Sequence, residues 1–218
     1  MIFKPGRKLV MIGDSITDYE RKRPVGEGLG EAMGHSYVVL IDALLKSTYP
    51  DSRIRIVNMG NSGDTVRDLK KRWRNDVLDL NPDWVSVLIG VNDVWRQFDS
   101  PLRTEEHVYY EEFEETYEQI IQFTEKETEG IILMTPFYME PNPQEPMRKM
   151  IDKYGEAVKK LAKKHNCILV DVQTAFDEYL RYYSAQSITW DRIHPDVVGH
   201  TIIARSFLNA VGFEWKRS

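Results

Sequence analysis

The sequence predicts an α/β fold with a five-stranded parallel sheet and helices on both of its faces. Five short apolar segments alternate with longer segments in which apolar residues recur every three or four positions. Consecutive parallel strands need a crossover, usually a helix, so this alternation favours a parallel sheet. Hydrophobic content of 42% and charged content of 29% are typical of a globular protein. The chain contains no repeat or linker, so we expect one domain spanning residues 1–218.

The first strand is expected in the apolar run before Gly13-Asp14-Ser15, where a sharp turn would expose the serine. The polar segment 18–34 follows and is expected to be a surface loop near this turn. Its glycines resemble a dinucleotide-binding motif only superficially, because Met33 occupies the third glycine position and no strand precedes the run. Apolar residues then share one face of the segment 37–48, which predicts a helix.

The middle of the chain predicts two further strands. Residues 53–58 alternate in polarity and end in a glycine-rich turn, after which a helix is expected to run to about Leu78. Residues 84–90 are almost continuously apolar, as in a strand that is buried on both faces. The segment 91–103, which carries Trp95, is expected to be a connector.

The second half of the chain supplies the last two strands. Two long segments place an apolar stripe along one face of a helix. The last helix is expected to start after Pro195, because proline is favoured in a first turn. In order, the expected elements are helix 104–127, strand 131–134, loop 137–143, helix 146–164, strand 167–172, helix 175–183, loop 184–195 and the final helix.

Composition and charge exclude several classes of protein. A net charge of −5 argues against a nucleic-acid-binding surface, which is usually basic. No apolar run approaches the roughly 18–20 residues of a membrane span, and no secretory signal opens the chain. The single cysteine, Cys167, excludes an internal disulfide and is expected in an inert, buried position. We therefore expect a cytoplasmic protein without membrane or nucleic-acid partners.

Four polar clusters follow predicted strands or lie in the last long loop. The carboxyl ends of parallel strands share one edge of a sheet, and open α/β sheets bind ligands at that edge. We therefore expect the clusters to meet at one site, although they are far apart in the sequence. The clusters are Gly13-Asp14-Ser15, Asn61-Ser62-Gly63, Gly90-Val91-Asn92-Asp93 and Asp191-Arg192-Ile193-His194.

Together the clusters contain the groups that acyl transfer requires. Ser15 is the expected nucleophile, His194 its general base and acid, and Asp191 the carboxylate that fixes the histidine tautomer. The oxyanion would be held by the backbone N–H groups of Ser15 and Gly63 and by the side-chain amide of Asn92. No His-Glu-x-x-His motif or carboxylate array is present, so neither a metal nor another cofactor is expected.

The clusters resemble blocks I, II, III and V of the GDSL/SGNH hydrolase superfamily, in the same order and over nearly the whole chain. The block I serine corresponds to Ser15, the block II glycine to Gly63 and the block III asparagine to Asn92. Block V corresponds to Asp191-x-x-His194. The resemblance implies a flavodoxin-like three-layer sandwich with five parallel strands. The Gly-x-Ser-x-Gly elbow of common α/β-hydrolases is absent.

Within that superfamily the chain is similar to the intracellular esterases that remove acetyl groups from xylo-oligosaccharides. The similarity lies in length, in loop content and in a tryptophan, Trp190, just before Asp-x-x-His. It implies a small acetylated carbohydrate as the substrate, with Trp190, Trp95 and Tyr138 as candidates to contact it. Three roles stay open for Trp190: stacking on a sugar ring, walling off the site, and packing against another subunit. Homo-oligomerisation is therefore left open.

Alternatives to this function stay open as well. The first is a lysophospholipase or thioesterase of the same superfamily, although charged and aromatic loops suit a long acyl chain poorly. The others are a non-catalytic carbohydrate-binding protein and a flavin-binding protein on the same fold. Simpler roles are expected for some polar residues. His200 is expected to be structural, Asp18 to cap the helix after Ser15, and Asp14 and Asp93 to hold their turns.

Overall fold

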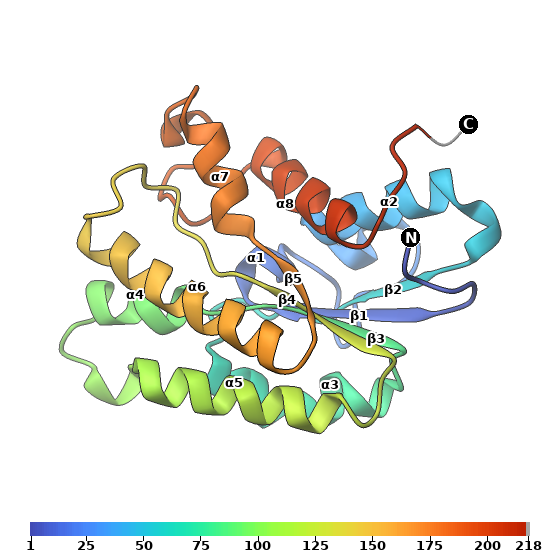
Figure 1. The fold of residues 1–218 in the computed structure, drawn as a ribbon, viewed down its shortest axis with the longest axis horizontal. Helices are drawn as coiled ribbons and strands as arrows, with labels where there is room; N and C mark the ends of the chain where they lie inside the picture. Colours follow the sequence, from blue (N-terminus) through green and yellow to red (C-terminus); the bar gives the residue numbers. More distant parts are fainter. Residues whose placement is uncertain (217–218) are drawn as a thin grey trace.

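The computed structural model describes residues 1–216 and contains a five-stranded, all-parallel sheet (Figure 1). The spatial order of the strands is β2-β1-β3-β4-β5, so the chain starts near the middle and crosses over β1 to build the second half. Every strand overlaps a segment in which the sequence predicted one, and the α/β class is confirmed. The strands are β1 (Lys8–Gly13), β2 (Arg55–Asn58), β3 (Trp84–Leu88), β4 (Gly130–Met134) and β5 (Ile168–Val170).

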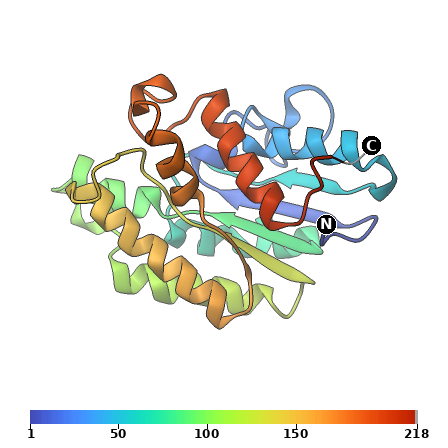
Figure 2. The same cartoon turned by 45° about the horizontal axis from the view of Figure 1, so that its top comes forward.

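Helices cover both faces of the sheet and complete the three-layer sandwich, as Figures 1 and 2 show. Helix α8 packs against α2 and α7 on one face, while α5 packs against α3 and α6 on the other. The α-helices are α1 (Ser15–Asp18), α2 (Tyr37–Thr48), α3 (Val66–Asp76), α4 (Val91–Asp99), α5 (Tyr110–Thr124), α6 (Pro146–Lys164), α7 (Val172–Leu180) and α8 (Val197–Ala210). Short 3-10 helices are η1 (Gly30–Met33), η2 (Pro50–Ser52), η3 (Leu78–Leu80), η4 (Thr104–Glu106) and η5 (Ala185–Ser187).

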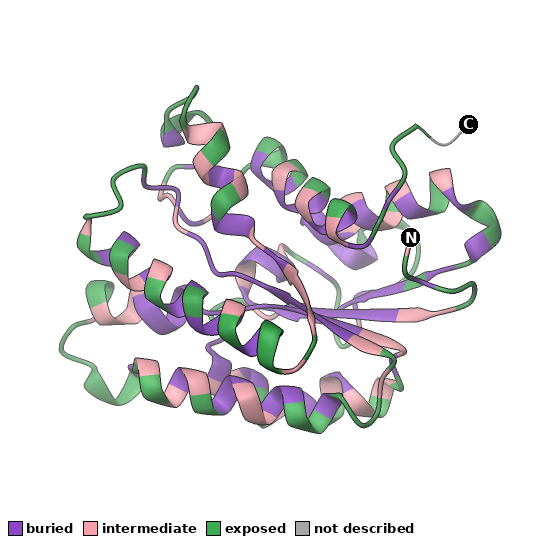
Figure 3. Cartoon of the chain, in the orientation of Figure 1, coloured by how far each residue is buried: buried purple, intermediate pink, exposed green. Residues whose placement is uncertain are grey.

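The sheet forms the centre of the hydrophobic core. The side chains from Leu9 to Ile12 in β1 are at most 1% exposed, and β3 and β4 are similarly buried. Figure 3 shows buried residues along the sheet and along the inner sides of the helices. The pairing register aligns Gly13 with Leu88 and Leu88 with Met134, so the carboxyl ends of three strands lie level. A close-packed core of this kind fixes where the following loops begin.

Several helices begin at a side-chain cap. The Ser36 hydroxyl accepts a hydrogen bond from the Val38 N–H at the start of α2. Thr65 and Asp68 form a reciprocal capping box at the start of α3, directly after the glycine-rich turn that follows β2. Asp196 accepts from two backbone N–H groups of α8. These caps fix the helix starts next to the loops that carry the polar clusters.

The expectation of a connector at residues 91–103 was wrong for its first part. Residues 91–99 form α4, in which Val91, Val94 and Phe98 recur at helical spacing. Gly90 turns the chain from β3 into this helix with a φ of +129°, a conformation that glycine adopts easily. The helical spacing was present in the sequence, but the polar residues between these positions disguised it.

Other predicted boundaries move by several residues. Helix α5 starts at Tyr110 instead of residue 104, because His107 is extended and separates it from the 3-10 turn η4. Helix α7 starts at Val172, directly after β5, with Asp171 as its cap. The segment 18–34 is irregular as expected, but it is not wholly at the surface, since Arg21 is buried. None of the helices described within residues 1–216 is long and apolar enough to cross a membrane.

Candidate active site

The four polar clusters meet at the carboxyl edge of the sheet. Ser15 is the first residue of α1 and directly follows the turn after β1. Asn92 lies in the first turn of α4, just beyond the end of β3, which is paired with β1. The loop before α8 returns across this edge and brings His194 to Ser15. The convergence expected from the sequence is therefore observed.

Ser15, His194 and Asp191 form a continuous hydrogen-bonded line. The distance from Ser15 Oγ to His194 Nε2 is 2.8 Å, and the distance from His194 Nδ1 to Asp191 Oδ2 is 2.6 Å. Both distances are within hydrogen-bonding range. In this arrangement Nδ1 donates to the carboxylate, which leaves Nε2 free to accept the serine proton.

The Asp191 carboxylate is kept ionised by its surroundings. Partial burial pushes its pKa upward, but hydrogen bonds from the His194 side chain and from the backbone N–H groups of His194 and Ile193 outweigh burial. The pKa of Asp191 is therefore lowered to about 2. A carboxylate that accepts several N–H bonds is expected to behave in this way. It stays charged at any pH at which the histidine can act as a base.

Residues 189–194, which we call the His194 turn, fold around two side chains. The Thr189 hydroxyl accepts the backbone N–H groups of Asp191 and Arg192. Asp191 Oδ1 in turn accepts the N–H groups of Ile193 and His194 at 2.9 and 2.8 Å. Arg192 has a φ of +67°, so the turn contains a non-glycine residue in the left-handed region. The same carboxylate thus shapes the turn and orients the imidazole.

The turn that presents Ser15 is equally constrained. Asp14 Oδ1 accepts the Ile16 N–H at 2.9 Å and caps α1. A Cβ on Gly13 would lie only 2.3 Å from the Leu88 carbonyl oxygen, so no side chain fits at that position. The Gly13 carbonyl accepts the N–H of Asn61, which links the turn to the loop after β2. The glycine of Gly13-Asp14-Ser15 is therefore required by close packing against β3.

Gly63 lies in an open position on the loop after β2. Its φ is +86°, and no other atom lies within 4 Å of the position that a Cβ would occupy. A substrate is therefore free to approach the backbone there. The preceding residue, Ser62, is fixed by Asp18, whose Oδ2 accepts both the Ser62 N–H at 3.0 Å and the Ser62 hydroxyl at 2.9 Å.

Asn92 is buried and held by one hydrogen bond. Its Nδ2 donates to the Asp64 carbonyl at 2.9 Å. A side-chain amide nitrogen carries two hydrogens, so a second donor remains on the same atom. The carbonyl that holds Asn92 belongs to the residue directly after Gly63, and the two candidate oxyanion donors are therefore linked.

Asp14 and Asp93, which we call the buried carboxyl pair, lie beneath the site. Asp14 holds its own turn as expected, whereas the Asp93 carboxyl reaches the start of α3, where its Oδ1 accepts the Val66 N–H at 3.0 Å. Within residues 1–216, Oδ2 of each carboxyl group is buried without a hydrogen-bond partner. Burial raises the pKa of Asp14 to about 7 and that of Asp93 to about 8. The pair is therefore largely protonated in mildly acidic solution.

Two tryptophans flank the imidazole of His194. The Trp190 ring is nearly parallel to it, with an angle of 8° and a centroid distance of 6.3 Å, and the residue is 84% exposed. Trp95 meets the imidazole edge-on at 6.0 Å. A hollow of about 420 Å³ opens beside His194 and is lined by Tyr19, Gln186, Ser187, Ile188, Thr189, Trp190, Pro195 and Asp196. A second hollow, of about 280 Å³, lies beside Gly63.

Several other candidates fall outside this hollow. Tyr138 is partly buried and interacts with Arg192 in the His194 turn. His200 is 1% exposed, and its Nδ1 accepts the Tyr37 N–H, which confirms the expected structural role. Burial lowers the pKa of His200 to about 4. Cys167 is half-buried just before β5, and burial raises the pKa of its thiol to about 11.

Asp18 was assigned wrongly from the sequence. It is the last residue of α1, so it does not cap that helix, and its carboxylate instead binds Ser62 and the guanidinium of Arg23. The Arg23–Asp18 contacts measure 3.0 and 2.7 Å. Ser62 lies 44 residues beyond Asp18, on the loop after β2, so no local sequence signal could have paired these two residues. In the part of the chain that the structure describes, no group of three His, Cys, Asp or Glu side chains could hold a metal ion.

The fold and this geometry agree with the known relatives of the chain. The sequence model of the GDSL-like lipase/acylhydrolase family matches residues 11–202, and the chain belongs to that family. The five-stranded parallel sheet and the Ser15–His194 contact are those of an SGNH-type serine esterase.

The chain is also similar, over its full length, to individually described proteins. An acetylxylan esterase of Geobacillus stearothermophilus is 53% identical over 213 residues, which cover 98% of this chain and 97% of that protein. The crystal structure of Axe2, an acetylxylan esterase from the same organism, superposes with a TM-score of 0.99 at 52% identity, with 100% of both chains covered. LAE5, an α/β hydrolase enzyme from the metagenome of Lake Arreo in Spain, gives a TM-score of 0.96 at 51% identity over 98% of each chain.

Proposed function

We propose that this esterase removes acetyl groups from acetylated xylo-oligosaccharides through an acyl-enzyme on Ser15. The observation that carries the proposal is the hydrogen-bonded line from Ser15 through His194 to Asp191 at the open edge of the sheet. The relatives support both parts of it. The full-length relative is an acetylxylan esterase, and Axe2 has been solved as catalytic mutants S15A, D191A and H194A.

The first half of the reaction acylates the serine. As Ser15 Oγ forms a bond to the ester carbonyl carbon, His194 Nε2 takes the hydroxyl proton. The tetrahedral intermediate then collapses: the bond from the carbonyl carbon to the alcohol oxygen breaks, and His194 returns the proton to that oxygen. The alcohol leaves, and Ser15 keeps the acetyl group. Asp191 remains ionised and stabilises the imidazolium that forms on His194.

The second half releases acetate. Water gives a proton to His194 and its oxygen attacks the acetyl carbonyl, after which the bond to Ser15 breaks and Oγ is reprotonated. In both halves the carbonyl oxygen carries a negative charge in the intermediate. The N–H groups of Ser15 and Gly63 and the second amide hydrogen of Asn92 are the proposed donors to that oxygen.

We assign the sugar to the hollow beside His194. The leaving oxygen must lie within hydrogen-bonding distance of His194 Nε2, and His194 lines this hollow. Its wall includes the exposed indole of Trp190, a flat surface on which a pyranose ring can stack. A small acyl group suits the remaining space, because polar backbone and charged residues surround Gly63.

A comparison of substrates tests this function. Purified protein is expected to hydrolyse acetylated xylo-oligosaccharide and 4-nitrophenyl acetate, and to be much slower on long-chain nitrophenyl esters and lysophospholipid. Ser15→Ala should lose on the order of 10⁶ in kcat, the loss expected when the nucleophile of a serine hydrolase is removed. A preference for long acyl chains would replace this function with that of a lysophospholipase or thioesterase.

The role of Trp190 has its own test. Trp190→Ala should raise KM for acetylated xylo-oligosaccharide and leave KM for 4-nitrophenyl acetate unchanged, because only the sugar reaches the indole. Leu102→Ala, which removes another highly exposed apolar side chain, is the matched control. An equal change in KM for both esters would argue against stacking on the sugar.

A further inference from the structure

Arg192 connects the His194 turn to a distant loop. It lies between Asp191 and His194, and its carbonyl accepts the Met139 N–H at 2.9 Å. Its guanidinium also binds the Glu140 carboxylate, with 2.5 Å between Nη1 and Oε2. Met139 and Glu140 belong to the segment 135–145 between β4 and α6, which we call the Glu140 loop. The turn is thus joined to this loop by one backbone contact, one ion pair and a side-chain contact between Arg192 and Tyr138.

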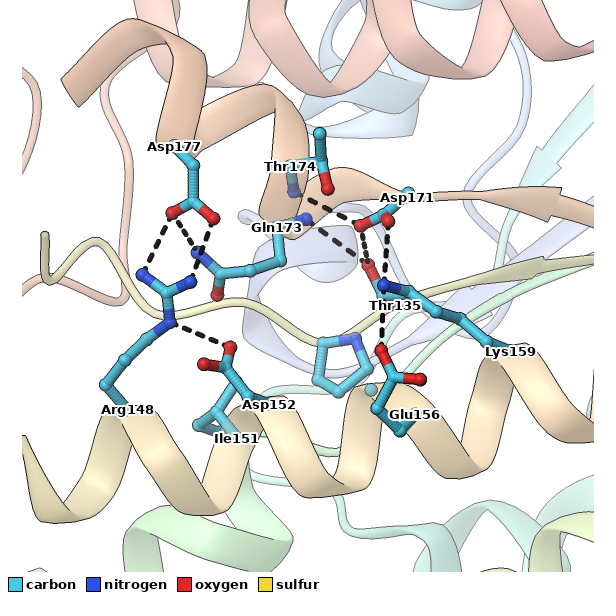
Figure 4. A pocket seen from close by; sticks show the side chains of 12 residues that line it. Thr135, Arg148, Ile151, Asp152, Glu156, Lys159, Asp171, Gln173, Thr174 and Asp177 are labelled. Atoms are coloured by element: carbon cyan, nitrogen blue, oxygen red, sulfur yellow. Dashed lines mark hydrogen bonds and ion pairs between the residues drawn. The ribbon is translucent and has the colours of Figure 1, made fainter. Parts of the chain in front are cut away.

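The Glu140 loop is itself firmly fixed. Glu140 is only 8% exposed, and its second carboxylate oxygen accepts the Asn142 N–H at 2.8 Å. Its carbonyl accepts a hydrogen bond of 2.6 Å from Arg148 in α6. Arg148 is buried and binds Asp177 of α7 through two hydrogen bonds of 2.9 and 2.8 Å (Figure 4). A chain of contacts therefore runs from the α6–α7 interface to the His194 turn.

Charged side chains that line a cavity at that interface connect α6 to the segment after β5. A space of about 240 Å³ lies between α6 and α7. Figure 4 shows the side chains that line it, with an ionic group at each end. At one end Arg148 binds Asp177 and Asp152, and at the other Lys159 binds Asp171 and Glu156. Each of the six charged side chains that line the space is thus engaged with an opposite charge. Their contacts join α6 to the segment after β5 and leave no free charge to attract a ligand.

Arg192 has a left-handed backbone conformation, with a φ of +67°, which must be held by contacts such as those with the Glu140 loop. A left-handed conformation is unfavourable for an L-residue, and it persists only where surrounding contacts enforce it. The turn's own hydrogen bonds come from Thr189 and Asp191, on the amino-terminal side of Arg192. The contacts with Met139 and Glu140 restrain the turn from outside.

We propose that Glu140 and Arg192 are positioning residues, which hold the His194 turn so that Nε2 stays within reach of Ser15 Oγ. The inference rests on the proposed function, since it assigns these residues a part in the same reaction. Neither residue belongs to the hydrogen-bonded line itself. Their effect passes through the backbone to His194, and it should therefore change the rate of the chemical step more than the binding of substrate.

The experiment compares Glu140→Gln, Arg192→Gln and the double variant with wild type. Glu114→Gln is the control, because Glu114 forms an ion pair of similar length with Lys160, between α5 and α6. Two readouts are used: kcat and KM on 4-nitrophenyl acetate, and the far-downfield proton resonance of His194 Nδ1–H in protein labelled at histidine. The second readout reports the His194–Asp191 hydrogen bond without requiring turnover.

Each single variant should lose about tenfold in kcat at unchanged KM. This loss is smaller than the ~10² expected when a catalytic group is misplaced by about 1 Å, because the hydrogen bond from the Met139 N–H still holds the turn. The double variant should be no worse than the single variants, since the two residues act as one unit. The His194 resonance should broaden or move in all three, and Glu114→Gln should match wild type in both readouts.

Two results would overturn the proposal: a Glu140→Gln variant indistinguishable from Glu114→Gln, or losses that simply multiply in the double variant. The proposed function fails differently. If Ser15→Ala hydrolysed acetate esters as fast as wild type, the acyl-enzyme would be wrong. The His194 resonance would still decide whether Glu140 and Arg192 hold the turn, so the two failures are distinguishable.

Discussion

The His194 turn and the buried carboxyl pair lie on two sides of Ser15 and treat the same chemical group in opposite ways. In the turn, Asp191 is surrounded by donors from Thr189, Ile193 and His194, and its pKa falls to about 2. In the pair, Asp14 and Asp93 each have one oxygen paired and one unpaired, and their pKa values rise to about 7 and 8.

Depth of burial and the number of hydrogen-bond donors together decide which carboxyl group is charged, because Asp14 and Asp93 are fully buried whereas Asp191 is only partly buried. Desolvation raises the pKa in both regions, but only the turn supplies enough N–H groups and an imidazole to outweigh it. The ionised group is the one that faces the histidine. The groups beneath the serine hold a single backbone N–H each and act as caps. The site thus separates an ionised carboxylate that faces the histidine from carboxyl groups of raised pKa that bind backbone N–H groups.

Asp191→Asn should have the largest effect, because it removes the charged carboxylate that distinguishes the His194 turn from the buried carboxyl pair. An amide in this position donates to His194 Nδ1 and so favours the tautomer in which Nε2 carries the proton and cannot accept another. Loss of kcat on 4-nitrophenyl acetate should reach about 10³–10⁴, the scale known for such a change in serine proteases. The thermal midpoint should be measured alongside. A folded variant with nearly full activity would show that the charge of Asp191 is dispensable.

Asn92→Ala tests the side of the site above the buried carboxyl pair. It removes the amide beside Asp93 without touching Ser15, His194 or Asp191. The loss in kcat should be about 10²–10³, as for one oxyanion donor, with KM little changed. Asn61→Ala, on the same loop as Gly63 but hydrogen-bonded to Asp64, is the control. Equal losses in the two variants would assign Asn92 a structural role.

The third prediction concerns stability and pH at Asp14. Its native pKa is about 7 and its ordinary value 3.8, so between these values the folded state binds more protons than the unfolded state. Its contribution therefore lowers stability as pH rises from about 4 to 7. Asp14→Asn keeps an oxygen for the Ile16 N–H but cannot ionise.

Calorimetry at several pH values can compare the stability of Asp14→Asn with that of wild type. The melting temperature of Asp14→Asn relative to wild type should increase with pH over that window by at least ~2–4 °C, which corresponds to ~1 kcal/mol in a chain of this size. Asp196→Asn, an exposed cap of α8, serves as the control. A difference that does not vary with pH would mean that Asp14 is ionised throughout.

His200 should have the smallest effect on the pH dependence of stability, and its effect should have the sign opposite to that of Asp14. Burial lowers its pKa from 6.5 to about 4, so the unfolded state binds more protons between these values and stability rises with pH. His200→Gln should remove this dependence while an amide oxygen accepts the Tyr37 N–H. The free energy of unfolding of His200→Gln minus that of wild type, measured in urea from pH 4 to 7, should decrease as pH rises. The corresponding difference for Asp14→Asn should increase.

The sequence was sufficient for the sheet but not for every helix. Each strand was a short apolar run with polar neighbours, and the alternation with helices fixed the parallel class. Helix α4 was missed because its polar residues Asn92 and Asp93 looked like the end of a turn. The start of α5 was misjudged because glutamates at 105 and 106 favour a helix, whereas His107 is extended. The single domain over residues 1–218 stays a prediction.

The site could be predicted where topology alone brings residues together. Strand ends that lie level put Ser15, Gly63 and Asn92 on one edge, and the spacing of Asp191 and His194 is local. The supporting contacts could not be predicted in this way. Asp18 with Ser62, and Glu140 with Arg192, join segments whose distance depends on how the loops pack. The protonation of Asp14 and Asp93 depends on burial, which single residues do not reveal.

The two outer strands of the sheet are short, and that has a consequence for how the protein behaves at high concentration. β5 has three residues, and β2 has four, the last of which, Asn58, exchanges two backbone hydrogen bonds with Gly26. Exposed strand edges are where sheets of different molecules join during aggregation. Here β5 is too short to pair over any length, and the edge of β2 is partly covered by its hydrogen bonds with Gly26. The short border strands therefore limit pairing with other molecules, while Ser15 and Asn92 follow the buried strands β1 and β3 in the middle of the sheet.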